Sequence, residues 1–99
     1  MSSCTEFAVF EVAKGNLERV VQLSESLFLE INADKKVIIF HEILRKTDNA
    51  EELCWHLIWS SPEAVKSVSK KWASYPSSSE LESLVGKKRY YGHFVSIKK

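Results

Sequence analysis

The sequence predicts an α+β fold of the ferredoxin-like type, with the order strand, helix, strand, strand, helix, short helix, strand. Three observations support this fold. Four runs are rich in β-branched and aromatic residues, an apolar helical stripe follows the first run, and a serine-proline helix start follows the third. This order is that of a split β-α-β unit, with one antiparallel sheet and both long helices on one face.

The composition is that of one globular domain, and we assign residues 1–99 to it. The 99 residues are 44% hydrophobic and 27% charged, with a net charge of +1, so the positive excess of a dedicated nucleic-acid binder is absent. Cys4 and Cys54 do not resemble a disulfide framework, and the short apolar runs predict neither a signal peptide nor a membrane span. We therefore expect a cytoplasmic protein without a nucleic-acid or membrane partner.

The first strand is expected at Glu6–Ala13, where Phe and Val dominate, and the segment Lys14-Gly15-Asn16 ends it. Asn16 is the expected N-cap of a helix that runs to about Ile31. The apolar stripe of this helix consists of Leu17, Val20, Val21, Leu27, Phe28 and Ile31, with Ser24 as its polar member. The opposite side is polar, so the helix should pack through one face.

A β-hairpin is predicted next. Val37–Lys46 and Leu53–Trp59 are apolar runs rich in β-branched and aromatic residues, and the polar segment Thr47–Glu52 separates them. If the turn is tight, it lies at Asp48-Asn49, and a longer turn would shift the register of the two strands. Both strands are apolar at odd and even positions, so they require cover on two sides, and two long helices can cover only one. We therefore expect a homodimer that pairs sheet faces into an α/β barrel.

Two helix-start signals follow the hairpin. Ser60-Ser61-Pro62-Glu63 places a capping serine before a proline and an acid, and Tyr75-Pro76 ends the helix that it begins. Ser79–Glu82 has capping-box spacing and predicts a short helix, which Gly86 should end in a left-handed conformation. The last strand is expected at Arg89–Ile97, with Tyr91, His93, Val95 and Ile97 on one side.

This sequence resembles the dimeric α/β-barrel superfamily and, within it, the antibiotic-biosynthesis-monooxygenase-like family. The element order of the whole chain carries the resemblance, together with the stretch Leu57–Ala64 and the short helix before the last strand. The stretch is similar to the family's strand-ending tryptophan, polar turn and helix-opening Glu-Ala. The resemblance implies a cofactor-independent oxygenase acting on aromatic polyketides or quinols, a haem-degrading enzyme, or a member without known activity.

One residue carries over from the family, and two positions depart from it. Trp59 lies where the family's enzymes often have a tryptophan that contacts substrate or haem. Val68 replaces a histidine that many members carry on the second long helix, and Phe7–Val12 lacks the first-strand asparagine of the haem degraders. The resemblance therefore favours an oxygenase-like protein over haem degradation, and we expect no cofactor.

The three histidines, His41, His56 and His93, all lie in predicted strands. With the tight turn, His41 lies opposite His56, and this pair could bind a metal if His93 or Cys54 supplied a further ligand. A longer turn would shift the register and leave the imidazoles hydrogen-bonded in the sheet or exposed at its edge. We expect no metal and select His56 as the candidate general base, because imidazole titrates near neutral pH.

Aromatic residues make up 11% of the chain and suggest a site for a flat small molecule such as a quinone. The candidate ligand-binding residues are Trp59, Trp55, Trp72 and Tyr91. The alternative is that these side chains fill the core and the subunit interface, where Trp and Tyr are enriched.

Two weaker signals have ordinary explanations. Glu11 and Glu42 interrupt apolar strands and could act as an acid and a base, but separate solvated edges explain them equally well. Lys87–Tyr91 could contact RNA, yet the aromatic-glycine signature of RNA-recognition modules is missing from Leu53–Trp59. Two hypotheses remain: a cofactor-independent monooxygenase-like enzyme, and a non-catalytic ligand-binding or assembly subunit of the same fold.

Overall fold

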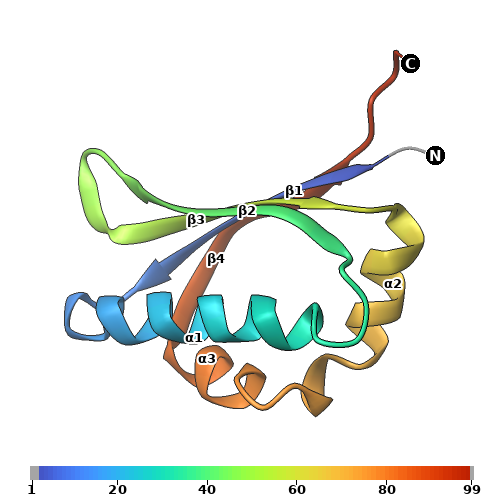
Figure 1. Cartoon of the computed structure of the whole chain (residues 1–99). Coiled ribbons are helices and arrows are strands. Elements are labelled where there is room, and N and C mark those ends of the chain that lie inside the picture. The colour runs from blue at the N-terminus through green and yellow to red at the C-terminus, as the bar shows by residue number, and fades with distance from the viewer. Residues whose placement is uncertain (1–2, 99) are drawn as a thin grey trace.

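The protein consists of a four-stranded antiparallel sheet with helices on one face (Figure 1). The structure is a computed structural model and describes residues 3–98. The strand order is β2-β3-β1-β4, and the predicted ferredoxin-like fold is confirmed. The elements are β1 (Cys4–Val12), η1 (Lys14–Asn16), α1 (Leu17–Ile31), β2 (Ile38–Lys46), β3 (Asn49–Trp59), α2 (Pro62–Lys70), η2 (Trp72–Ser74), α3 (Ser78–Leu84) and β4 (Val85–Phe94).

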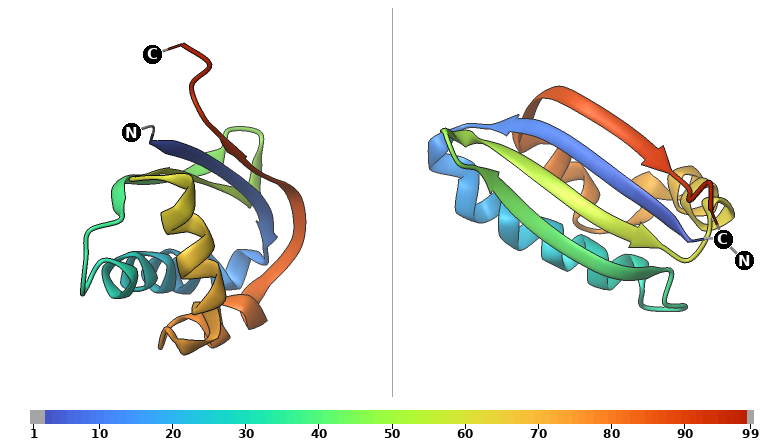
Figure 2. Two further views of the ribbon diagram at one scale, coloured as in Figure 1. Left: turned by 90° about the vertical axis from the view of Figure 1, so that its right-hand side faces the viewer. Right: turned by 90° about the horizontal axis from the view of Figure 1, so that it is seen from above.

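The sheet has an inner face that packs against the helices and an outer face turned away from them (Figure 2). Successive side chains of a strand point to opposite faces, so β1 alternates between buried and half-buried positions along its whole length. Its inner positions are Cys4, Glu6, Ala8, Phe10 and Val12. The core therefore lies between the inner face and the helices.

Most of the predicted stripe of α1 is buried against this inner face, and Leu23 joins it, while Leu17 and Val21 are half-buried and pack against the core. Ser61 caps α2 as expected: its Oγ accepts a hydrogen bond from the backbone N–H of Ala64 at 3.1 Å. Asn16 precedes α1 but makes no side-chain capping bond. Within residues 3–98, no helix is long and apolar enough to cross a membrane.

The hairpin differs from the prediction in its turn and its register. Lys46 pairs with Asn49, so the turn lies one residue earlier than predicted, and the pairing then shifts so that Arg45 lies opposite Leu53. β3 thus has extra residues between Asn49 and Leu53 that have no partner on β2. They shift the pairing of the two strands by one residue from the pairing that a tight turn at Asp48-Asn49 would give. His56 consequently lies opposite Glu42, and the predicted pairing of His41 with His56 is wrong.

The last strand begins earlier than expected and also ends earlier. β4 follows α3 directly, starts at Val85 where that residue pairs with Val12, and stops at Phe94. Gly86 is thus a strand residue without a positive φ, which corrects its predicted role as a left-handed helix end. A Cβ there would lie 3.3 Å from the carbonyl oxygen of Glu11, so the glycine permits close approach of β1 and β4.

Candidate functional site

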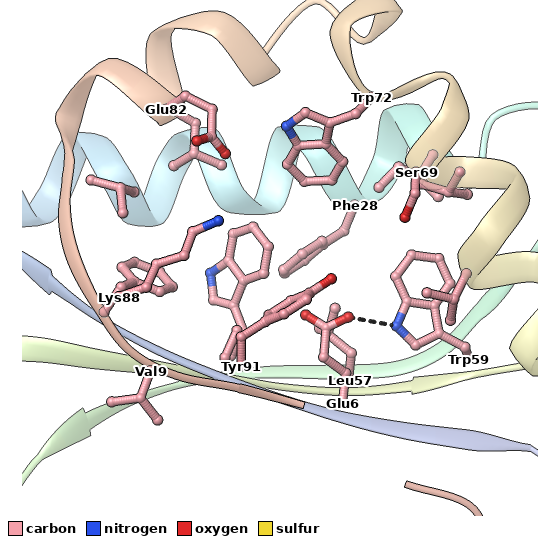
Figure 3. Close-up of a pocket in the computed structure, with 18 of the residues that line it drawn as sticks. Glu6, Val9, Phe28, Leu57, Trp59, Ser69, Trp72, Glu82, Lys88 and Tyr91 are labelled. Atoms are coloured by element: carbon pink, nitrogen blue, oxygen red, sulfur yellow. Dashed lines mark hydrogen bonds between the residues drawn. The ribbon is translucent and has the colours of Figure 1, made fainter. Parts of the chain in front are cut away.

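A cavity of about 500 Å³ lies between the inner face of the sheet and the helices (Figure 3). Its wall is mostly aromatic and aliphatic, which suits a small organic ligand with a flat apolar body. The apolar lining includes Phe10, Phe28, Trp55, Leu57, Trp59, Val65, Val68 and Trp72. Strands β1, β3 and β4 supply its floor, and α1, α2, η2 and α3 supply its roof.

All three tryptophans of the chain line this cavity. Trp55 and Trp59 lie on the inner face of β3, two residues before and two residues after Leu57. Trp72 belongs to η2. The indole N–H of Trp55 donates to Ser24 Oγ at 3.1 Å, so its ring is held against α1. The residues that we predicted to bind a ligand, including Tyr91, therefore line one cavity, while ligand binding itself stays a prediction.

A buried carboxylate belongs to the same wall. Glu6 is only 3% exposed, and its Oε1 accepts a hydrogen bond from Trp59 Nε1 at 3.0 Å. The same oxygen lies 2.9 Å from His93 Nε2, on the β4 residue that pairs directly with Glu6. Burial raises the pKa of Glu6 above its ordinary value, although the nearby His93 and the indole N–H act in the opposite direction.

The mouth of the cavity carries polar side chains. Ser69, Glu82, Lys88 and Tyr91 line the cavity and are also exposed, so the opening lies between the helices and the edge strand β4. In Figure 3 the Tyr91 hydroxyl points toward the Glu6 side of the cavity. Partial burial and the charge of Glu6 raise the pKa of Tyr91, and Lys88 Nζ lies 5.6 Å from its ring centre.

His56, which we selected as the candidate general base, does not line this cavity. Adjacent residues of a strand point to opposite faces, so His56 lies on the outer face. Its ring stacks on Phe7 with centroids 4.7 Å apart, and its Nδ1 lies 3.1 Å from Glu42 Oε1. His56 therefore has no access to a ligand beneath the helices.

The metal hypothesis loses its geometric basis for the same reason. His41 lies opposite Leu57 and packs on Phe28 with ring centroids 5.0 Å apart, on the inner side of the sheet. His41 and His56 thus lie on opposite faces. Among residues 3–98, no group of three or more His, Cys, Asp or Glu side chains is arranged to hold a metal ion.

Sequence reasoning missed Glu6, and the missing signal is identifiable. The predicted strand began at Glu6, so the residue resembled a polar strand end. The observed strand begins at Cys4, and Glu6 then occupies an inner position between two buried residues, Cys4 and Ala8. A carboxylate in phase with the buried residues of a strand is the pattern that could have identified it.

The outer face of the sheet is largely uncovered. Phe40, Leu44, Tyr90 and Phe94 are exposed there, around the half-buried Phe7. Figure 2 shows that the helices of residues 3–98 all lie on the other side of the sheet. A contiguous apolar face of this kind is typical of an interaction surface.

The fold is shared with solved structures of low sequence identity. SnoaB from Streptomyces nogalater, a cofactor-independent oxygenase, superposes with a TM-score of 0.74 and 18% identity, over 100% of this chain and 97% of that chain. A Chloroflexus aurantiacus protein provisionally named an antibiotic biosynthesis monooxygenase has a TM-score of 0.72 and 13% identity, covering 99% of this chain and 96% of that chain.

A dimeric ferredoxin-like protein from an uncultured marine organism is similar as well, with a TM-score of 0.72 and 11% identity over 100% of this chain and 91% of that chain. No model of a known protein family matches this sequence, and no curated protein matches it. At these identities the similarity establishes the fold. The predicted resemblance to antibiotic-biosynthesis-monooxygenase-like proteins is confirmed at that level.

Proposed function

We propose that this protein is a cofactor-independent monooxygenase-like protein that binds a hydroxylated aromatic or quinone-type molecule beneath the helices. The observation that carries the proposal is the cavity itself, in which three tryptophans surround a space of about 500 Å³ and a buried carboxylate, Glu6, lies in the wall. Aromatic walls suit flat ligands, and a few convergent polar groups orient them. SnoaB, with the same fold, is a cofactor-independent oxygenase.

The proposed reaction needs dioxygen as its oxidant and an electron-rich substrate as its reductant. An aromatic ketone with an acidic methylene group, R₂CH₂, would react with O₂ to give R₂C=O and H₂O. One oxygen atom enters the product, and the other leaves as water with the two hydrogens of the methylene group. The substrate supplies the electrons, so the chain's own task is to bind, orient and deprotonate it.

We also propose that the protein acts as a homodimer through its outer sheet face. Phe40, Leu44, Tyr90 and Phe94 expose large apolar side chains on that face, and a second copy would cover them with an identical surface. The dimeric ferredoxin-like neighbour supports this arrangement. The cavity lies on the opposite side of the sheet, so each subunit would hold its own ligand.

Tryptophan fluorescence tests ligand binding directly, because every tryptophan lines the cavity. We expect 1,8-dihydroxyanthraquinone to quench the emission saturably. Val65→Phe should weaken binding, since Val65 lines the cavity and a larger side chain would fill part of it. Lys66→Phe on the exposed side of α2 is the matched control and should leave binding unchanged. Quenching that is equal in all three proteins would contradict a ligand in this cavity.

Oxygen consumption separates the two function hypotheses. With 1,8-dihydroxyanthrone and purified protein in a metal-free buffer, an oxygen electrode should record uptake above the uncatalysed rate, and the anthraquinone should accumulate in equal amount. Saturable binding without enhanced oxygen uptake would instead support the non-catalytic ligand-binding alternative.

A further inference from the structure

The Glu6 carboxylate presents its two oxygens to different surroundings. Oε1 is within hydrogen-bond distance of two nitrogens: Trp59 Nε1 at 3.0 Å and His93 Nε2 at 2.9 Å. Oε2 has no hydrogen-bond partner among residues 3–98, although every fully enclosed polar side-chain atom in that part of the chain has one. Oε2 is therefore not fully enclosed, and since Glu6 lines the cavity, this oxygen is the one that a ligand can reach.

We infer that Glu6 is the catalytic base of this site, that its Oε2 removes a proton from the bound ligand, and that His93 is its positioning partner. This inference rests on the proposed function. In the step, a C–H bond of the acidic methylene group breaks, its electron pair stays on the ligand as an enolate, and the proton forms an O–H bond with Oε2. Trp59 and His93 hold the other oxygen, so the carboxylate cannot rotate away.

The surroundings of Glu6 suit proton uptake. Burial raises the pKa of this carboxyl, which makes it a stronger proton acceptor than an exposed glutamate. The ionisable groups near it are Cys4 on its own strand and His93, Tyr91 and Lys88 on β4, while Glu82 on α3 lines the same cavity. Helices α1 and α2 line the cavity with apolar side chains and the Ser69 hydroxyl, so they contribute no charge there.

The other carboxylates that interrupt the strands are unsuited to this role. Glu11 lies on the outer face of β1 in an ion pair with Arg89, and Glu42 lies on the outer face of β2 beside His56. Neither lines the cavity. Glu11 therefore provides a matched control, because Glu11→Gln is the same substitution on the same strand and the opposite face.

Hydrogen–deuterium exchange without oxygen isolates the proposed step. Under anaerobic conditions in D₂O, wild-type protein should accelerate exchange of the methylene protons of 1,8-dihydroxyanthrone, followed by NMR. General-base catalysis typically contributes about 10²–10⁴-fold. We expect Glu6→Gln to lower the protein-catalysed rate by at least about 100-fold, while quenching by 1,8-dihydroxyanthraquinone shows that binding is retained. Glu11→Gln should exchange at the wild-type rate.

His93→Gln provides a second variant if Glu6→Gln does not fold. A positioning role predicts that the pH profile of exchange shifts while ligand binding stays unchanged. An unaltered exchange rate in Glu6→Gln, or an unaltered pH profile in His93→Gln, would overturn the inference and leave the proposed binding function intact. Exchange that depends on Glu6 without any oxygen uptake would support the base and refute the monooxygenase reaction. Wild-type protein that neither binds nor exchanges the anthrone would refute both the proposed function and the base, whereas binding without exchange would refute only the base.

Discussion

The two faces of the sheet are built from the same strands, yet they differ in almost every property. The inner face buries Trp55, Trp59 and aliphatic side chains around a cavity, and both indole N–H groups are paired: that of Trp55 with Ser24 and that of Trp59 with Glu6. The outer face exposes aromatic side chains such as Phe40 and Phe94, and no helix of residues 3–98 lies over them. One face thus encloses a cavity, and the other leaves large apolar side chains exposed.

The difference teaches that strand phase, more than residue type, separates the two roles. Trp55 and His56 are neighbours in the sequence, but one faces the cavity and the other stacks on Phe7 outside. Glu6 and Phe7 show the reverse assignment, since the charged residue is inside and the aromatic one is outside. A list of aromatic or titratable residues therefore cannot locate the site until each is assigned to a face.

The largest effect should come from the centre of the inner layer. Phe28 is 1% exposed and packs on Trp55 with ring centroids 4.9 Å apart. Phe28→Ala should lower the free energy of unfolding by about 3–5 kcal/mol, measured by urea denaturation. Leu29→Ala is the control on the same helix, because Leu29 is 71% exposed and should change stability by less than about 0.5 kcal/mol. Equal losses in both variants would contradict the assigned helix phase.

A charge on the outer face should disrupt the proposed dimer. Phe40 is 42% exposed as a single chain, and dimerisation would bury it. Phe40→Asp should raise the dimer dissociation constant by more than about tenfold, because an unpaired carboxylate would be desolvated in the interface. Sedimentation velocity over a concentration series measures this constant, with Leu29→Asp as the control on the helix side. A monomeric wild-type protein at micromolar concentration would refute the dimer itself.

The buried polar contact of the inner face should have an intermediate effect. Ser24 Oγ accepts from Trp55 Nε1 and donates to the carbonyl oxygen of Val20, and Ser24→Ala leaves the indole N–H without this partner. An unsatisfied buried donor costs about 1–3 kcal/mol, which urea denaturation can resolve. Ser83→Ala removes an exposed hydroxyl that bonds the carbonyl oxygen of Glu80, so it should be nearly neutral. If Ser83→Ala lowered the free energy of unfolding more than Ser24→Ala did, the Trp55 side chain could not be enclosed.

Local chemistry explains how much of this fold the sequence alone could predict. The apolar stripe of α1 and the Ser61 cap depend on residues a few positions apart, and both predictions are confirmed. The hairpin register depends on how the chain accommodates extra residues in β3, which no local pattern specifies. That one-position shift separated His41 from His56.

The candidate site was predictable only in part, for a related reason. The aromatic residues could be named from composition and resemblance, and the structure places all four beside one cavity. The contact between Glu6 and His93 joins residues 87 positions apart through the pairing of β1 with β4. A contact of that range depends on strand order and register, so the sequence provided no direct signal for it.

The buried carboxylate should make stability depend on pH. Because the pKa of Glu6 in the folded protein lies above its ordinary value of 4.5, the folded state holds this proton to higher pH than the unfolded state does. Stability from this group is complete below that ordinary value and is lost as pH rises through the folded pKa. Relative to wild type, Glu6→Gln should therefore gain stability between pH 4.5 and neutral pH, as urea denaturation at several pH values can show. If the stability of Glu6→Gln relative to wild type fell as the pH rose, the pKa of Glu6 could not be raised in the folded protein.

The smallest effect should come from a polar contact on the solvent side of the helices. Arg19 on α1 makes a bidentate ion pair with Glu80 on α3, in which Nε lies 2.8 Å from Oε2 and Nη2 lies 2.6 Å from Oε1. Both side chains are exposed. Arg19 lowers the pKa of Glu80, so any stabilisation is present above the ordinary carboxyl pKa and is lost as pH falls through the lower folded value. Solvent and salt screen such pairs, with a Debye length of about 3 Å at 1 M salt. We expect the coupling between Arg19→Ala and Glu80→Ala in a double-mutant cycle to be small in low salt and absent in 1 M salt. Coupling as large as the effect of Ser24→Ala would show that this pair, and not burial against the sheet, determines how α1 and α3 are held together.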